Sequence, residues 1–125
     1  MKRRTNMNFI GIDIVEIARI QSAIERWDKR FLNRIYTEAE LEACQNRIAS
    51  LATHFAGKEA VMKALGTGTK GVGWREIEIL ANADGKPLVQ LYGRARERAQ
   101  KLHLTEFSIS LSDTKLYAVA AAIGA

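Results

Sequence analysis

A segment with few polar positions, from Leu51 to Leu65, limits the folds that this chain can adopt. On a helix with about 100° per residue, its large apolar side chains cover one broad arc, and alanines line most of the remaining circumference. Such a helix is buried on nearly every side. The chain therefore has to supply other elements that cover it, and its 125 residues are enough for one core.

Three charged residues interrupt this apolar segment. Lys58 falls inside the apolar arc, whereas Glu59 and Lys63, four residues apart, lie together on the alanine-lined side. Charges in such places are unfavourable unless they are paired or bind a ligand. Two interpretations stay open: Glu59 and Lys63 form an ordinary helix ion pair, worth about 0.3 to 0.5 kcal/mol, or they belong to a site. The scarcity of polar neighbours favours a site.

An acidic residue also interrupts the first apolar segment. Ile10, Ile12 and Ile14 alternate with smaller residues, which predicts a strand over 8–15 with Asp13 on the face opposite the isoleucines. Asp13 either caps the next helix or binds a ligand. A strand carboxylate and a helix carboxylate, here Asp13 and Glu59, can share one Mg²⁺ that also binds phosphates and waters.

The remaining pattern predicts one α+β domain with helices packed on a largely antiparallel sheet. The predicted elements are the strand over 8–15, helices over 17–28 and from the capping box at 37–40, a longer helix to about 65 with a possible break near 46, strands over 74–80 and 88–92, a helix over 94–102, and strands over 107–112 and 116–123. Residues 1–7 are expected to be a disordered basic extension, and residues 8–125 a single domain.

Composition excludes several classes of protein. No segment approaches the roughly 18 apolar residues of a membrane span, and the lone Cys44 excludes a disulfide scaffold and fits a cytoplasmic protein. His54 and His103 are too few for a zinc site, and no Ser-His-Asp arrangement is supported. The net charge of +5 indicates an anionic partner: nucleic acid, a phosphorylated small molecule or an acidic protein.

Glycines are dense just after the long apolar segment. Residues 66–71 read Gly-Thr-Gly-Thr-Lys-Gly, and Gly73 follows. Glycines let backbone amides approach a phosphate or nucleotide closely, but they also serve as an ordinary helix stop, and both interpretations stay open. The loop is not a P-loop, because it follows a helix and lacks the Lys-Ser/Thr ending.

Two motifs resemble those of the holo-(acyl-carrier-protein) synthases, the short bacterial 4′-phosphopantetheinyl transferases. Residues 11–20 read GIDIVEIARI, and residues 55–68 read FAGKEAVMKALGTG. Residues 84–87 and 110–113 also match, so that the resemblance covers residues 9–123. It implies the 4′-phosphopantetheinyl transferase fold and transfer of phosphopantetheine from coenzyme A to a serine of apo acyl carrier protein, with adenosine 3′,5′-bisphosphate released, in fatty acid biosynthesis.

The resemblance also assigns roles to individual residues. Asp13 and Glu59 are implied to hold Mg²⁺, Glu59 also to accept the serine proton, and Lys63 to neutralise or protonate the leaving phosphate. The residues implied to bind coenzyme A are Lys58, Lys63, Gly66, Thr67, Gly68 and His54. The sequence departs from the family's pattern at two positions. His54 stands where many relatives have arginine, which would weaken a phosphate contact there. Asp113 stands where a substantial part of the family has histidine, which puts a role of this turn in acid-base chemistry in doubt.

The implied macromolecular partners are an acidic carrier protein and further copies of the chain. Arg19 matches the family's carrier-protein contact, and Arg26 and Arg30 are expected to help it. The family forms homotrimers whose sites lie between subunits.

Two alternatives from other classes remain. A small basic nucleic-acid-binding module fits the isoelectric point near 9.6, but it requires aromatic residues among the basic ones. Aromatics are only 7% of residues, and Trp27 and Phe55 are predicted on apolar faces away from the arginines, so no nucleic acid is expected. An inactive trimeric scaffold is expected to lose Asp13, Glu59 and Lys63, and all are present.

Overall fold

The structure, a computed structural model, describes residues 9–125, so the predicted extension over residues 1–7 lies outside the described residues. The elements are β1 (Phe9–Glu16), α1 (Ile17–Trp27), α2 (Lys29–Ile35), α3 (Glu38–Cys44), α4 (Ile48–Leu65), α5 (Gly68–Gly71), the 3₁₀ turn η1 (Trp74–Glu76), β2 (Ile77–Ala81), β3 (Pro87–Leu91), α6 (Gly93–Lys101), β4 (Phe107–Asp113) and β5 (Tyr117–Gly124). This α+β arrangement is the predicted fold class. None of the described helices is long and apolar enough to cross a membrane.

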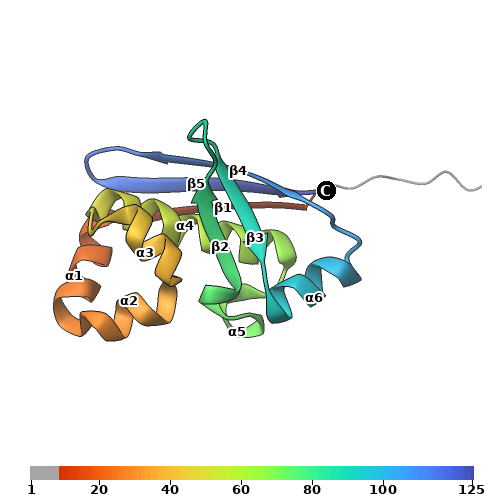
Figure 1. Ribbon diagram of the computed structural model, residues 1–125, viewed down its shortest axis with the longest axis horizontal. Coiled ribbons are helices and arrows are strands. Elements are labelled where there is room, and N and C mark those ends of the chain that lie inside the picture. Colours follow the sequence, from red (N-terminus) through yellow and green to blue (C-terminus); the bar gives the residue numbers. More distant parts are fainter. Residues whose placement is uncertain (1–8) are drawn as a thin grey trace, which may run out of the picture.

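The strands form two antiparallel sheets where one was predicted. β1, β5 and β4 form a three-stranded sheet in that order, and β2 and β3 form a separate hairpin that lies beside β4. Helix α4 packs across one face of the larger sheet. Helices α1 to α3 gather at one end of the molecule, and α6 lies at the other (Figure 1).

The prediction that the apolar segment forms a buried helix is confirmed. Ala52, Ala56 and Ala60 of α4 have no exposed surface, and the alanines of β5 that face the helix are equally buried. Small residues on both elements let the helix approach the sheet closely. The approach is tightest at Gly11 of β1, where an added Cβ would lie 1.8 Å from the carbonyl oxygen of Ala60.

The isoleucines of β1 point to solvent rather than to α4. Ile10, Ile12 and Ile14 are 62%, 59% and 63% exposed, whereas Asp13 and Val15 on the opposite face are buried. The close approach of α4 accounts for this choice of face, because the helix leaves no room for a large side chain at Gly11. Alternation in the sequence had predicted the two faces correctly, but not which of them is covered.

Three elements differ from the prediction, one of them the short helix α5, which forms within the glycine-dense segment 66–71. The chain turns at Asp28, where φ is 45°, and forms α2 in a segment to which the sequence assigned no element; Phe31 and Leu32 of α2 pack against the core. The strand predicted from Trp74 begins at Ile77. The Glu76 carboxylate accepts a hydrogen bond from the Gly73 amide, which closes a 3₁₀ turn before the strand.

Candidate active site

Asp13 and Lys63 meet where β1 crosses α4. The Lys63 ammonium donates to the Asp13 carboxylate at 3.0 Å and to the carbonyl oxygen of Ile12 at 2.9 Å. The Asp13 side chain is 11% exposed and that of Lys63 is 53% exposed. The Asp13 side chain is therefore fixed in a mostly buried position. The Lys63 side chain stays partly exposed to solvent, where it can bind another anion.

Glu59 completes this group one helical turn before Lys63. Its side chain is partly buried, and burial, followed by the negative charge of Asp13, raises the pKa of the Glu59 carboxyl; Lys63 and, more weakly, Arg19 oppose the rise. Two carboxylates so close together repel each other, and a cation relieves that repulsion. The structure thus brings together the three residues that the sequence singled out at the strand and the helix.

The donor set suits Mg²⁺ bound together with a phosphorylated ligand. No group of three or more acidic, histidine or cysteine side chains that could hold a metal occurs among residues 9–125. A pair of carboxylates still fits Mg²⁺, because this ion is usually bound through one or two carboxylates, with waters and substrate phosphates as its other ligands. Asp13 and Glu59 are such a pair.

Lys58 lies elsewhere, and its placement contradicts the expectation that it contacts a phosphate. The side chain has no exposed surface, and its ammonium lies 2.6 Å from the Glu40 carboxylate. The remaining ammonium protons go to the carbonyl oxygens of Trp74 and Ile77. Burial lowers the pKa of Lys58, and Glu40 opposes this shift. A fully buried ammonium with three protein partners has no donor left for a substrate phosphate.

The glycine loop follows α4 directly. Gly66 caps the helix with φ of 72°, Gly68 has φ of 60°, and Thr67 lies between them. Arg98 of α6 donates from Nε to the carbonyl oxygen of Leu65 at 2.9 Å and so holds the end of α4. Sequence reasoning missed Arg98 and also Glu40 as the partner of Lys58, because no local pattern links residues so far apart in the chain.

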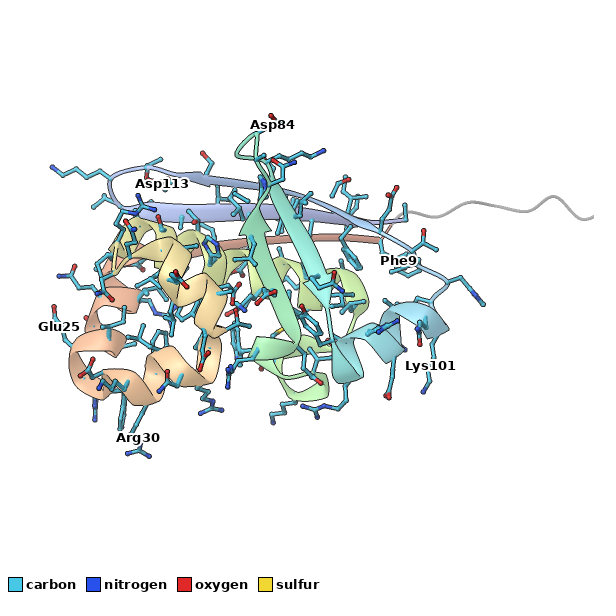
Figure 2. The ribbon with its side chains drawn as sticks, viewed as in Figure 1. Phe9, Glu25, Arg30, Asp84, Lys101 and Asp113 are labelled. Carbon is cyan, nitrogen blue, oxygen red and sulfur yellow. The ribbon has the colours of Figure 1, made fainter. Side chains whose placement is uncertain are left out.

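His54 and Asp113 are not part of the group around Asp13. His54 lies five residues before Glu59, about 140° away around α4, and its Nδ1 is 2.8 Å from the carbonyl oxygen of Ser50. It lines a hollow of about 330 Å³ between the β2–β3 hairpin and β4. Asp113 is exposed at the end of β4, near α1 (Figure 2). Within one chain, therefore, neither joins the carboxylate pair.

The arginines of the first two helices surround an exposed aromatic residue. Arg26 and Arg30 lie 5.0 and 5.8 Å from the ring centre of Trp27, and Trp27 is 46% exposed. The prediction that Trp27 lies on an apolar face away from the arginines is therefore wrong. Trp27, Arg30, Phe31 and Arg34 line a hollow of about 450 Å³ at this corner.

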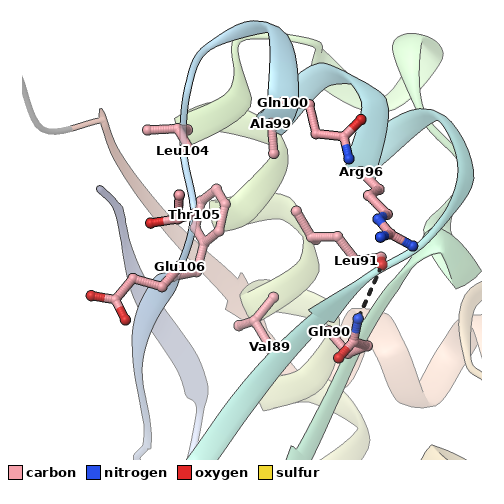
Figure 3. A pocket seen from close by; sticks show the side chains of 10 residues that line it. Val89, Gln90, Leu91, Arg96, Ala99, Gln100, Leu104, Thr105 and Glu106 are labelled. Atoms are coloured by element: carbon pink, nitrogen blue, oxygen red, sulfur yellow. Dashed lines mark hydrogen bonds between the residues drawn. The ribbon is translucent and has the colours of Figure 1, made fainter.

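Another hollow, also of about 450 Å³, lies between β3, α6 and the start of β4 (Figure 3). Its lining includes Val89 of β3, Arg96 and Gln100 of α6, and Leu104 and Glu106 of the segment before β4. None of the predicted site residues lines it.

Comparison with known proteins identifies the family to which the chain belongs. A family model described as the 4′-phosphopantetheinyl transferase superfamily matches residues 9–122. The chain belongs to this superfamily. Among curated relatives, a holo-[acyl-carrier-protein] synthase of Dehalococcoides mccartyi is 51% identical over 114 residues, which are 91% of this chain and 95% of that protein. One of Herpetosiphon aurantiacus is 45% identical over 121 residues, with the same shares covered.

Solved structures of phosphopantetheinyl transferases share the fold. The holo-[acyl-carrier-protein] synthase of Helicobacter pylori, in complex with coenzyme A, superimposes with a TM-score of 0.85 at 33% identity, over 93% of this chain and 99% of that one. The enzyme of Neisseria meningitidis gives a TM-score of 0.87 at 32% identity, over 95% and 99%. The resemblance stated from the motifs is confirmed, and these relatives give the nucleic-acid-binding alternative no support.

Proposed function

We propose that this protein is a holo-(acyl-carrier-protein) synthase. It transfers the 4′-phosphopantetheine group of coenzyme A to a serine of apo acyl carrier protein and releases adenosine 3′,5′-bisphosphate. The observation that carries this proposal is the meeting of Asp13, Glu59 and Lys63 in a chain of this superfamily. Carrier proteins modified in this way serve fatty acid biosynthesis, and the lone buried Cys44 suits a reducing cytoplasm.

Asp13 and Glu59 would hold one Mg²⁺ against the diphosphate of coenzyme A. The ion supplies neutralisation of the charge that develops on the phosphoryl oxygens as the diphosphate breaks. Asp13 is fixed because it lies within a paired strand opposite Ala120 and is paired with Lys63. Glu59 is held by the rigid helix α4.

The remaining groups move the proton and the leaving phosphate. The serine oxygen attacks the phosphorus that carries pantetheine, and the bond from this phosphorus to the oxygen on the adenosine side breaks with its electron pair. Glu59 accepts the serine proton, and the exposed ammonium of Lys63 neutralises the leaving phosphate or gives it a proton. The Gly66–Gly68 loop after α4 borders the nucleotide.

The basic surface of α1 and α2 receives the carrier protein. Arg19 lies at the start of α1 and acts electrostatically on Glu59, while Arg26 and Arg30 flank Trp27 at the other end of the helix. Trp27 lies eight positions after Arg19, or about 12 Å further along the helix axis. An acidic helix lying along this surface would bring its serine to Glu59 at one end and place an apolar side chain at Trp27.

We further propose that the protein is a homotrimer with sites between subunits. The outer face of the three-stranded sheet carries Ile10, Ile12 and Ile14 of β1, together with Tyr117 and Val119 of β5, all partly or largely exposed. Monomeric proteins rarely expose a continuous apolar face of this kind. Two further copies of the chain would cover it.

Mass spectrometry of apo acyl carrier protein tests the reaction directly. After incubation with this protein, coenzyme A and Mg²⁺, we expect the carrier to gain the mass of one phosphopantetheine group, and to gain none when coenzyme A or the metal is omitted. An unmodified carrier in the complete mixture would contradict the proposed function.

A further inference from the structure

A buried ion pair lies on another face of the helix that carries Glu59 and Lys63. Lys58 of α4 and Glu40 of α3 have no exposed surface, and their charged atoms are 2.6 Å apart. The Glu40 carboxylate also accepts hydrogen bonds from the backbone amides of Thr37 and Ile79, both at 2.9 Å. Every polar atom of the pair is satisfied, because no buried side-chain nitrogen or oxygen in residues 9–125 lacks a partner.

The bonds of this pair join α4 to three other elements. Glu40 connects it to the first turn of α3 and to β2, and Lys58 donates to the carbonyl oxygens of Trp74 in η1 and Ile77 in β2, at 3.1 and 2.5 Å. These contacts are directional and come from fixed backbone groups, so they define where the Lys58 side chain can point.

A second constraint acts on the other side of the same helix. At Ala60 the backbone of α4 is pressed against Gly11 of β1, with no room for even one methyl group. Residues 58 and 60 point about 200° apart around a helix, and residue 59 lies about 100° from each. The ion pair and the β1 contact therefore constrain α4 from nearly opposite sides, and Glu59 points from the helix in a direction between the two. Lys63 lies about 40° from Glu59, on the same face.

We propose that Lys58 and Glu40 are positioning residues: their buried ion pair sets the rotation of α4 and thereby the placement of Glu59 and Lys63 against Asp13. This inference rests on the proposed function for the role of those three residues. A helix with its side chains is about 10 to 12 Å wide, so a rotation of about 20° moves a side-chain end by about 2 Å. Displacements of about 1 Å in an active site can lower rates about 100-fold.

The test uses a double variant that keeps the space of the two buried side chains filled. Lys58→Met alone would leave Glu40 charged and buried and can prevent folding, whereas Lys58→Met with Glu40→Met replaces the ion pair by apolar side chains of similar volume, a change that proteins often tolerate. Ile35→Val, a core change in α2 that removes none of the pair's hydrogen-bond partners, is the control for a general loss of stability. Thermal unfolding by circular dichroism shows that each protein is folded at the assay temperature.

Three measurements on the folded double variant test the assignment. We expect kcat to fall about 10- to 100-fold and the affinity for Mn²⁺, followed by electron paramagnetic resonance, to fall about 10-fold or more. The calorimetric affinity for adenosine 3′,5′-bisphosphate without metal should stay within about twofold of the wild type. Ile35→Val should change none of the three.

Other outcomes overturn the inference in distinguishable ways. Weakened adenosine 3′,5′-bisphosphate binding with unchanged Mn²⁺ affinity would show that Lys58 contacts a phosphate after all. A stable double variant with wild-type kcat and Mn²⁺ affinity would show that the pair serves stability alone. Failure of the proposed function appears instead as absence of transfer by the wild type, and Mn²⁺ binding then still reports on the carboxylate pair.

Discussion

Three charged residues of α4 lie within six positions of one another and occupy three different environments. Lys58 is sealed inside the protein against Glu40, Glu59 is partly buried beside Asp13, and Lys63 is largely exposed. Their chemistry follows from these environments. The buried ammonium of Lys58 has only a structural role. The Glu59 carboxylate, beside that of Asp13, attracts a cation, and the exposed ammonium of Lys63 can bind an anion.

Loss of either carboxylate of the proposed metal pair should nearly abolish transfer. Asp13→Ala and Glu59→Ala should both stay folded, because neither side chain contributes to the apolar core. The double variant should be little worse than either single one, because once the ion is misplaced the second carboxylate has little left to do. Calorimetry of coenzyme A binding with and without Mg²⁺ checks this. Metal dependence that survives in both single variants would show that the ion binds elsewhere.

Charge reversal at Arg19 should weaken capture of the carrier protein alone. Arg19→Glu places a negative charge toward an acidic partner, so the KM for the carrier should rise about tenfold or more, while the KM for coenzyme A should hardly change. Arg96→Glu, an equally exposed reversal on α6, is the matched control. A parallel rise of both KM values for Arg19→Glu would place this arginine in the nucleotide site instead.

Helix α4 and strand β1 pack against each other extensively and approach most closely at Gly11 and Ala60. The isoleucine face of β1 is free because its other face carries Gly11, which lets the backbone of Ala60 approach. This approach brings Asp13, two residues further along the strand, against the helix that carries Glu59 and Lys63. The site is therefore a property of the two elements together.

Gly11→Ala should disturb both stability and activity. Its methyl group would lie 1.8 Å from the carbonyl oxygen of Ala60, so the strand or the helix has to move. Overpacking of this kind lowers the free energy of unfolding by about 1 to 3 kcal/mol. Urea denaturation measures the loss, and transfer assays on the folded fraction should show a kcat reduced by about tenfold or more. Gln100→Ala on the exposed side of α6 should leave both values unchanged.

The outer face of the three-stranded sheet determines how whole molecules associate. Exposed isoleucines on β1, beside Tyr117 and Val119 of β5, leave a single copy with an apolar surface that water solvates poorly. We expect this surface to be buried between subunits.

Ile12→Lys should separate the subunits without unfolding them. Ile12 is 59% exposed in the single chain, so the substitution disturbs no internal packing, but a lysine on the covered face would be desolvated. Sedimentation should give three times the 13.9-kDa chain mass for the wild type and the single mass for Ile12→Lys, with transfer lost as well. Leu88→Lys, at an exposed apolar residue of β3, is the control. A wild-type monomer with full activity would contradict the proposed assembly.

The sequence by itself determined most of the elements and placed three charged residues of the candidate site on two of them. Period-two alternation predicted β1, with Asp13 on one face of the strand and the isoleucines on the other. The apolar segment predicted α4, with Glu59 and Lys63 on one side of the helix. The two motifs identified the family, which the comparisons confirm. These inferences succeeded because periodicity and motif spacing depend on residues a few positions apart.

Only the tertiary structure decided which faces are covered and which charges meet. Lys58 pairs with Glu40, 18 positions earlier, and bonds to carbonyl groups 16 and 19 positions later, so no local pattern revealed that it is sealed away from substrate. Trp27 lies among arginines because the chain turns at Asp28 and brings Arg30 back over its ring. The isoleucines of β1 face outward because α4 approaches the opposite face too closely for large side chains. Each of these outcomes depends on contacts between elements, and a charged or apolar side chain acquires its role only when such contacts set its burial.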